Sequence, residues 1–176
     1  MRRGRLMGSM RHVVCLLILL AGKGGAQWQH FDARQTDAAP SSLSREMLAA
    51  HNAVRTRLKI APLAWSERLA AVARNWADTL LARREFVHRP NSKYGENLFD
   101  VTGAGASPGQ VVDGWAAEAR NYDYGSNKCS GVCGHYTQIV WGDTKEVGCA
   151  VARGGGREVW VCEYDPPGNW QGKRPY

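Results

Sequence analysis

The sequence predicts an α+β fold, specifically a three-layer αβα sandwich in which helices cover both faces of a small antiparallel sheet. One observation is helical spacing of apolar residues in three segments before residue 123. The other is a pair of alternating apolar segments around a glycine-rich turn near the C-terminal end. Helices that precede a hairpin in this order bury their apolar stripes against its faces, which gives the layered arrangement.

Three helices are predicted. The first spans residues 44–58 with Ser44 as its N-cap, and the second spans 67–83 behind Ser66. The third opens with Ser107–Gln110, where serine and glutamine form a capping box and proline occupies the first turn. The side chains predicted to face the core are Met47, Val54 and Leu58, then Leu69, Val72, Ala73, Trp76 and Leu80, then Val111, Val112, Trp115, Ala119 and Tyr122.

Two strands are predicted at 147–152 and 159–164. Apolar residues alternate in both segments, and Gly154–Gly156 between them supplies the backbone freedom of a tight turn. The Pro166–Gly168 run then ends the second strand because proline cannot donate to a strand ladder. These segments therefore form an antiparallel hairpin.

The N-terminal residues 1–26 have the pattern of a signal peptide, with arginines, an apolar core over 13–20, and small residues up to Ala26. An apolar core of roughly eight residues is too short for a membrane span, which needs about twenty. Translation from Met7 or Met10 would give a leader of more usual length. The sequence thus predicts a secreted, extracellular protein with a flexible arm at 27–42 and one domain at 43–176.

Charge and cysteine content narrow the function. The whole chain has a net charge of +7, but removal of the leader leaves 18 basic and 16 acidic side chains. Nucleic-acid binding depends on many phosphate contacts, so a nearly neutral domain excludes that partner class. The four remaining cysteines, an even number in an oxidising compartment, predict two disulfides with three possible pairings. A zinc site at Cys129 and Cys133 is the alternative for the closely spaced pair.

Several motifs in one order resemble those of the CAP superfamily of cysteine-rich secretory, venom-antigen and pathogenesis-related proteins. The resemblance covers nearly everything after residue 42 and implies the same αβα sandwich. It also implies disulfides Cys129–Cys133 and Cys149–Cys162. The segments that carry it are His51–Arg55, His88, Gly95–Leu98, Trp115 with Glu118, Gly134–Trp141 and Val161–Trp170.

The resemblance implies a cleft that holds His88, Glu96, Glu118 and His135. Glu118 lies three residues after Trp115 and four before Tyr122, which places its carboxylate beside the apolar stripe of the third helix. Two neutral imidazoles can bind a divalent cation, with carboxylates completing the shell or orienting the histidines. Zinc is the expected ion, and copper or magnesium fits less well.

Three functions remain open from the sequence. The first is a cation-binding cleft used in extracellular interaction with a ligand, for which the resemblance implies a sterol, a fatty acid or another small lipid; the segment 101–109 is the candidate loop over an apolar groove. The second is a metal-dependent hydrolase with Glu96 or Glu118 as general base. The third is a defence or matrix module in which the cluster only holds the fold. Because the chain lacks the usual hydrolase motifs, we expect a protein that is not an enzyme.

Other polar residues are interpreted as structural. His51, Asn52 and Arg55 lie on the first helix and are expected to tie it to the C-terminal segment at Asn169–Trp170. The remaining members of the shared motifs, Asn97, Tyr136 and Gln138, are expected to satisfy backbone groups around the cleft.

Overall fold

The computed structural model describes residues 41–176; the predicted signal peptide and all but the last two residues of the predicted arm lie outside this range. The helices are α1 (Ser42–Arg57), α2 (Glu67–Arg83), α3 (Pro108–Ala116) and α4 (Gly134–Ile139), with a 3₁₀ helix η1 at Ala117–Asn121. The strands are β1 (Ala64–Trp65), β2 (Gly95–Thr102), β3 (Tyr122–Asp123), β4 (Lys128–Cys129), β5 (Glu146–Gly154) and β6 (Arg157–Asp165).

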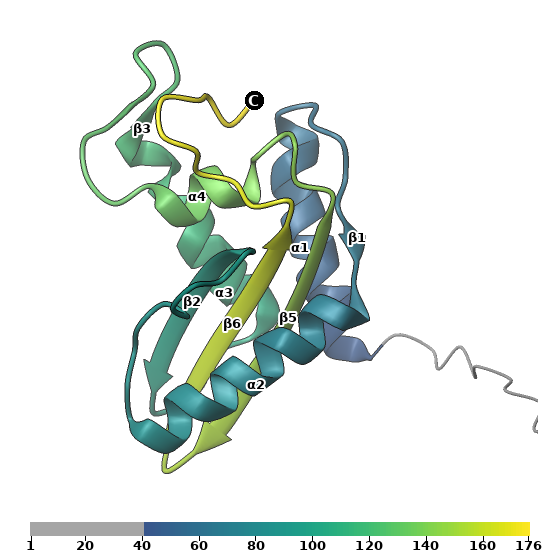
Figure 1. The fold of residues 1–176 in the computed structure, drawn as a ribbon, viewed down its shortest axis with the longest axis vertical. Coiled ribbons are helices and arrows are strands. Elements are labelled where there is room, and N and C mark those ends of the chain that lie inside the picture. The colour runs from purple at the N-terminus through teal and green to yellow at the C-terminus, as the bar shows by residue number, and fades with distance from the viewer. Residues whose placement is uncertain (1–40) are drawn as a thin grey trace, which may run out of the picture. The chain divides into compact units, whose positions relative to one another are not determined.

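The main sheet has the strand order β1-β5-β6-β2 and lies between two helical layers (Figure 1). Helix α2 covers one face, and α1, α3 and α4 lie on the other, so the predicted three-layer sandwich is confirmed. The sheet is mixed, because the two-residue β1 pairs in parallel with β5 while β5, β6 and β2 are antiparallel. Backbone bonds from Ala64 to Lys145 and from Ser66 to Val147 hold the chain beside β5 just before it enters α2.

The helices follow the predicted pattern with small shifts. Helix α1 begins two residues earlier than expected, since Ser41 caps it by accepting from the Ser44 amide. The capping box of Ser107 and Gln110 is present at the start of α3. Ala119 was predicted to be buried and is exposed, because the backbone leaves the α-helical path at Ala117 and continues as a 3₁₀ helix with a different side-chain period.

The hairpin between β5 and β6 turns at Gly155 and Gly156, whose φ angles are 58° and 74°. Positive φ at both central residues explains the glycines there. Both expected disulfides are present, Cys149–Cys162 between directly opposed residues of β5 and β6, and Cys129–Cys133 in the loop before α4. The zinc alternative for Cys129 and Cys133 is therefore wrong, because their thiols are used in a disulfide.

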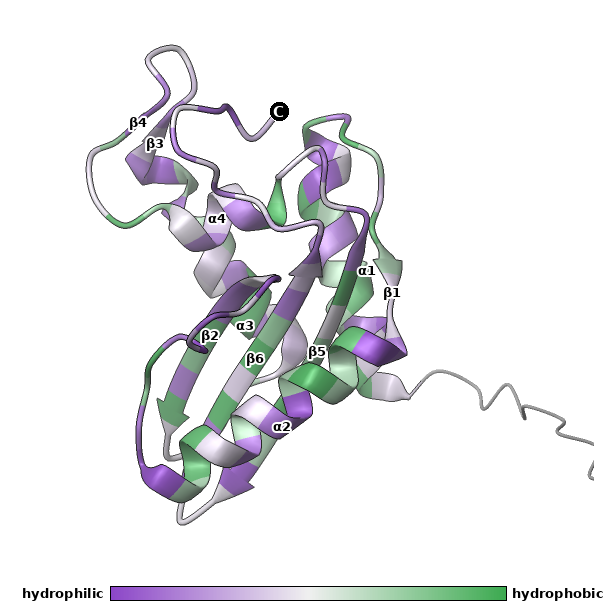
Figure 2. Cartoon of the chain, in the orientation of Figure 1, coloured by the Kyte–Doolittle hydropathy of each residue, from purple (hydrophilic) through white to green (hydrophobic). Residues whose placement is uncertain are grey.

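Alternation along the strands sends neighbouring residues to opposite faces of the sheet. Glu96, Leu98, Val161 and Glu163 face the α2 layer, whereas Tyr164 belongs to the core under α1, α3 and α4. Hydrophobic residues mark β5, β6 and α2 in Figure 2, with polar positions at the Gly95 end of β2.

The first turn of α2 lies against the β5 backbone at Gly148, where a Cβ atom would overlap Ala70 and Ser66. Within residues 41–176, no helix has the length and apolar character needed to cross a bilayer.

Candidate functional site

Two histidine–glutamate pairs lie where β2 begins and where α4 begins. In the first pair, His88 Nδ1 donates to Glu96 Oε1 over 2.6 Å, and the Arg89 amide donates to the same oxygen over 3.1 Å. The Glu96 side chain is only 5% exposed, whereas His88 in the preceding loop is 66% exposed. The hydrogen bond to Glu96 raises the pKa of His88 above its usual value, against the opposing effect of partial burial.

In the second pair, His135 Nδ1 donates to Glu118 Oε1 over 2.6 Å. The other Glu118 oxygen accepts the backbone amides of His135 and Tyr136 at 2.9 and 3.4 Å, so this carboxylate also caps the start of α4. The His135 ring stacks on Trp115, with ring centroids 6.1 Å apart. The imidazole is thus fixed on one side by a carboxylate and on a second by an indole.

The two pairs share one feature that suits metal binding. Each imidazole donates through Nδ1 to a carboxylate, so Nε2 keeps the lone pair that a cation would take. Metal-binding histidines usually have such a partner, which sets the tautomer and the ring orientation. The four residues therefore have the donor chemistry expected for a divalent cation.

One hydrogen bond connects the two pairs. Asn97, next to Glu96, donates through Nδ2 to the His135 carbonyl oxygen over 3.1 Å. Within residues 41–176, however, no three ligand atoms from the four residues lie within 4.8 Å of one another. The four residues therefore do not form a compact set of three or more ligand atoms in this structure.

Glu163 is a further buried acid at the first pair, and the sequence analysis did not single it out. It lies directly opposite Glu96 in the β2–β6 register and is 0% exposed. Among the residues that the structure describes, neither of its oxygens, nor Glu96 Oε2, has a hydrogen-bond partner. Burial, and then the Glu96 charge, raise the pKa of Glu163 to about 8, with Arg89 and His88 acting in the opposite direction. The period-two pattern of Val159, Val161 and Glu163 was the available signal.

A buried hydrogen-bond chain runs on the opposite face of the sheet. Asn97 donates to the Tyr164 hydroxyl over 3.1 Å, and that hydroxyl donates to His51 Nε2 over 2.8 Å. His51 Nδ1 then donates to the Met47 carbonyl over 2.7 Å. Because a carbonyl oxygen only accepts, these bonds fix one neutral tautomer. Burial is the main reason that the pKa of His51 falls to about 4.

The prediction that polar residues of the first helix bond the segment Asn169–Trp170 is wrong, because their hydrogen-bond partners lie elsewhere. Arg55 is fully buried and donates instead to four backbone carbonyls, those of Ala61, Ile139, Trp141 and Thr144. Asn52 bonds both backbone groups of Leu63. Sequence spacing indicated a polar face on α1, but it carried no information about which distant backbone groups would lack partners.

One other group of potential ligand atoms is compact. His51, Cys149 and Cys162 supply atoms within 4.8 Å of one another. The two sulfurs form a disulfide, and both nitrogens of His51 are hydrogen-bonded. A metal could bind here only if the disulfide were first reduced and the hydrogen bonds of His51 were broken, so this group fits a metal poorly.

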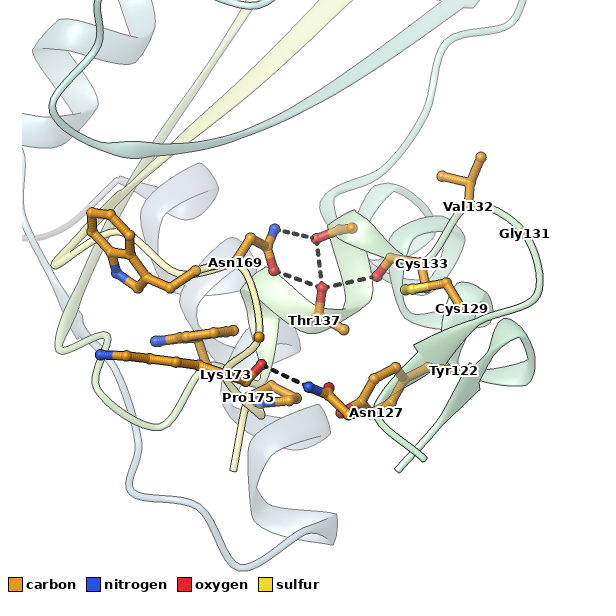
Figure 3. A pocket seen from close by; sticks show the side chains of 14 residues that line it. Tyr122, Asn127, Cys129, Gly131, Val132, Cys133, Thr137, Asn169, Lys173 and Pro175 are labelled. Atoms are coloured by element: carbon orange, nitrogen blue, oxygen red, sulfur yellow. Dashed lines mark hydrogen bonds between the residues drawn. A yellow bond between two sulfur atoms is a disulfide. The ribbon is translucent and has the colours of Figure 1, made fainter. Parts of the chain in front are cut away.

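A pocket of about 420 Å³ lies between the Cys129–Cys133 loop, α4 and the C-terminal segment (Figure 3). It contains none of the four paired residues. Helix α4 contributes Gly134 and Thr137 to the pocket, and Trp141, just after the helix, also lines it. His135 of the same helix does not line the pocket.

The segment 101–109, the candidate lipid-binding loop, lies at the far end of β2 from Glu96. Its backbone is tied to the hairpin by bonds from Gly103 to Gly156 and from Ala106 to the Glu158 carboxylate. A concavity of about 880 Å³ occurs at that end, but its lining residues include none from 101–109.

Comparison with known proteins identifies the family. The model of the cysteine-rich secretory protein (CAP) family matches residues 48–164. The chain belongs to the CAP family. Pathogenesis-related protein 1 of Arabidopsis thaliana is 39% identical over 92% of this chain and 95% of that protein. Pathogenesis-related protein 1A of Nicotiana tabacum is 42% identical over 75% of this chain and 80% of the relative.

Solved CAP-type structures share the fold. Schistosoma mansoni venom allergen-like protein 4 superposes with a TM-score of 0.67 and 27% identity, over 78% of this chain and 95% of that one. NaASP2, whose structure was determined with Zn²⁺, gives a TM-score of 0.63 and 25% identity, over 80% and 88% of the two chains. The predicted membership and fold of this CAP protein are therefore confirmed.

Proposed function

We propose that this CAP protein is a secreted, defence-related binding module that holds a divalent cation, with zinc preferred, through His88 and His135. The observation that carries the proposal is the pairing of both imidazoles, through Nδ1, with buried or half-buried carboxylates at 2.6 Å. The similar NaASP2 protein, studied with Zn²⁺, supports the choice of ion. Secretion is supported by its similarity to pathogenesis-related proteins.

The same contacts favour binding over catalysis. A metal-dependent hydrolase needs a free general base beside the activated water. Glu118 uses both oxygens on His135 and on the start of α4, and Glu96 uses Oε1 on His88 and the Arg89 amide, so that only its buried Oε2 lacks a partner within residues 41–176. In this arrangement the glutamates orient histidines. The cation would neutralise the carboxylates and hold the β2 and α4 ends in a form that presents an extracellular ligand site, for which sterols and fatty acids are the first candidates.

Calorimetric titration of zinc into metal-free protein tests the cation site. One ion per chain is expected, together with a gain in unfolding free energy of about 2.7 kcal/mol when free zinc exceeds the dissociation constant a hundredfold. His88→Ala and His135→Ala should each abolish this ion if both imidazoles share it. Glu46→Gln, at an exposed position on α1, is the control for general binding to surface acids.

Other results would contradict this function. An equal heat of binding in the double variant His88→Ala, His135→Ala would rule out these ligands. Two ions per chain, each lost with one histidine, would replace the shared site by two separate ones. Turnover of a peptide or ester that Glu96→Gln and Glu118→Gln both abolish would favour the hydrolase.

A further inference from the structure

The pocket in Figure 3 is lined by residues from the stretch 122–141 and from the C-terminal segment 169–175, which is distant in the sequence. The loop closed by Cys129 and Cys133 forms one wall, α4 forms the floor, and the segment from Asn169 to Pro175 forms the opposite wall. Its volume of about 420 Å³ falls in the range of small-molecule sites, roughly 300–1,000 Å³. It is therefore large enough for a ligand of one or two rings.

The amide groups in the walls are already used. Asn169 accepts from Thr137 through Oδ1 and donates to the Gly134 carbonyl through Nδ2, at 2.6 and 2.9 Å. Asn127 accepts from the Tyr122 hydroxyl and donates to the Lys173 carbonyl. Figure 3 shows the Thr137, Asn169 and Lys173 bonds, which join one wall to the next. These bonds pre-form the pocket, and they leave the two amides little capacity for a ligand.

The groups of the pocket that are still available to contact a ligand are an indole ring and the ammonium group of one lysine. Trp170 is 56% exposed, and its Nε1 donates to the Pro167 carbonyl, so the polar edge is satisfied and the ring surface is open. Trp141, only 3% exposed, and the buried Pro175 lie behind it and complete the apolar lining. Lys173 has the only formal charge among the lining residues, and its ammonium group has no ion pair or hydrogen bond within residues 41–176.

We propose that this pocket is a binding site for small aromatic carboxylates, whose ring stacks on the indole lining and whose carboxylate pairs with Lys173. A planar apolar ring gains contact with the open face of Trp170, and an anionic group complements the unpaired ammonium. A sugar fits less well. Its hydroxyl groups would lose hydrogen bonds to water, and the Asn127 and Asn169 amides, which already have partners, could not replace them. The site uses other residues than the cation site and is independent of it.

The test is calorimetric titration of 2-naphthoate into the full secreted chain, followed in parallel by tryptophan fluorescence. Saturable binding of one molecule per chain is expected. Its uncharged analogue, 2-naphthamide, should bind about two- to fivefold more weakly, the range for a partly exposed ion pair. Lys173→Met should weaken 2-naphthoate by the same factor and leave 2-naphthamide unchanged.

Two further variants separate this site from non-specific binding. Trp170→Ala should weaken both probes at least tenfold, because the ring surface is lost for acid and amide alike. Lys93→Met removes a charge outside the pocket and should change neither affinity. Circular dichroism and melting curves check that each variant is folded. The proposal is overturned by an absence of saturable binding, by equal affinity for acid and amide, or by folded Lys173→Met and Trp170→Ala proteins that bind 2-naphthoate as the parent does.

Discussion

Two faces of the same sheet treat buried polar groups in opposite ways. Asn97 and Tyr164 point to the α1 side, where they and His51 form a chain in which each successive contact is a hydrogen bond. Their sequence neighbours Glu96 and Glu163 point to the α2 side, where three carboxylate oxygens have no partner within the described range 41–176. One residue of offset along β2 and β6 thus separates a satisfied network from an unsatisfied one.

The difference indicates that the polar groups on the α1 side stabilise the domain more than those on the α2 side do. A buried polar group costs stability unless it is bonded, and a buried charge costs more. A network with its partners in place rigidifies a core, as the chain from Asn97 to Met47 does here. The unsatisfied oxygens of Glu96 and Glu163 lie on the side of the first pair, where a cation held by His88 would offset their cost. Three experiments test this contrast.

The largest effect is expected from Arg55→Met on the satisfied face. The substitution keeps an apolar stem but removes the donors to the Ala61, Ile139, Trp141 and Thr144 carbonyls. Unfolding free energy should fall by about 3–5 kcal/mol, because buried carbonyls lose their partners. Urea denaturation measures the change. Arg57→Met, at an exposed position on the same helix, should change stability by no more than about 0.5 kcal/mol. If Arg57→Met lowered stability as much as Arg55→Met, the loss could not be assigned to the buried hydrogen bonds of Arg55.

The second effect is a dependence on pH from His51. Its pKa is about 4 in the folded protein, below the ordinary histidine value of 6.5 that applies to the unfolded chain, so the unfolded chain takes up the proton first. The stability from the neutral ring is complete above pH 6.5 and declines as pH falls to about 4, by about 3 kcal/mol in total. Urea denaturation at pH 7 and pH 4.5 checks this. His51→Gln should lack this part of the decline; identical pH profiles would show that His51 does not titrate as described.

The smallest effect is expected from Glu163→Gln on the unsatisfied face. Because burial raises the pKa of Glu163 to about 8, its contribution to stability is present below its ordinary value of 4.5 and declines as pH rises to about 8. Between pH 6.5 and 8, the parent should therefore lose about 1–2 kcal/mol more than the variant. Denaturation in the presence of a chelator measures it free of metal. A larger loss in the variant would mean that the charged carboxylate is stabilised in the fold.

Local patterns predicted the first three helices and the hairpin, but not β2 or α4. The apolar period predicted the bounds of α2, the capping box predicted the start of α3, and the glycine run 154–156 predicted the hairpin turn. These features depend on residues close together in the chain. The parallel pairing of Ala64–Trp65 was not predicted, because a two-residue strand has no period of its own.

The candidate site was less predictable. Motif resemblance nominated His88, Glu96, Glu118 and His135, but spacing could not show that each histidine is hydrogen-bonded to one of the glutamates through Nδ1. Arg55 was misassigned because its acceptors are backbone atoms up to 89 positions away. Strand alternation could have identified Glu163. It falls on the same face as Val159 and Val161, and a glutamate on a buried face is rare.

The close seating of α2 on β5 has a consequence for sequence variation. At Gly148 a methyl group would occupy the space of the Ala70 and Ser66 backbones, which cannot rotate away as a side chain can. In a saturation library, this position should accept glycine alone among folded clones, although its backbone is ordinary extended strand. Gly148 pairs with Glu163 across the β5–β6 ladder. A substitution at Gly148 would therefore also require α2 to move away from the part of the sheet that contains Glu163.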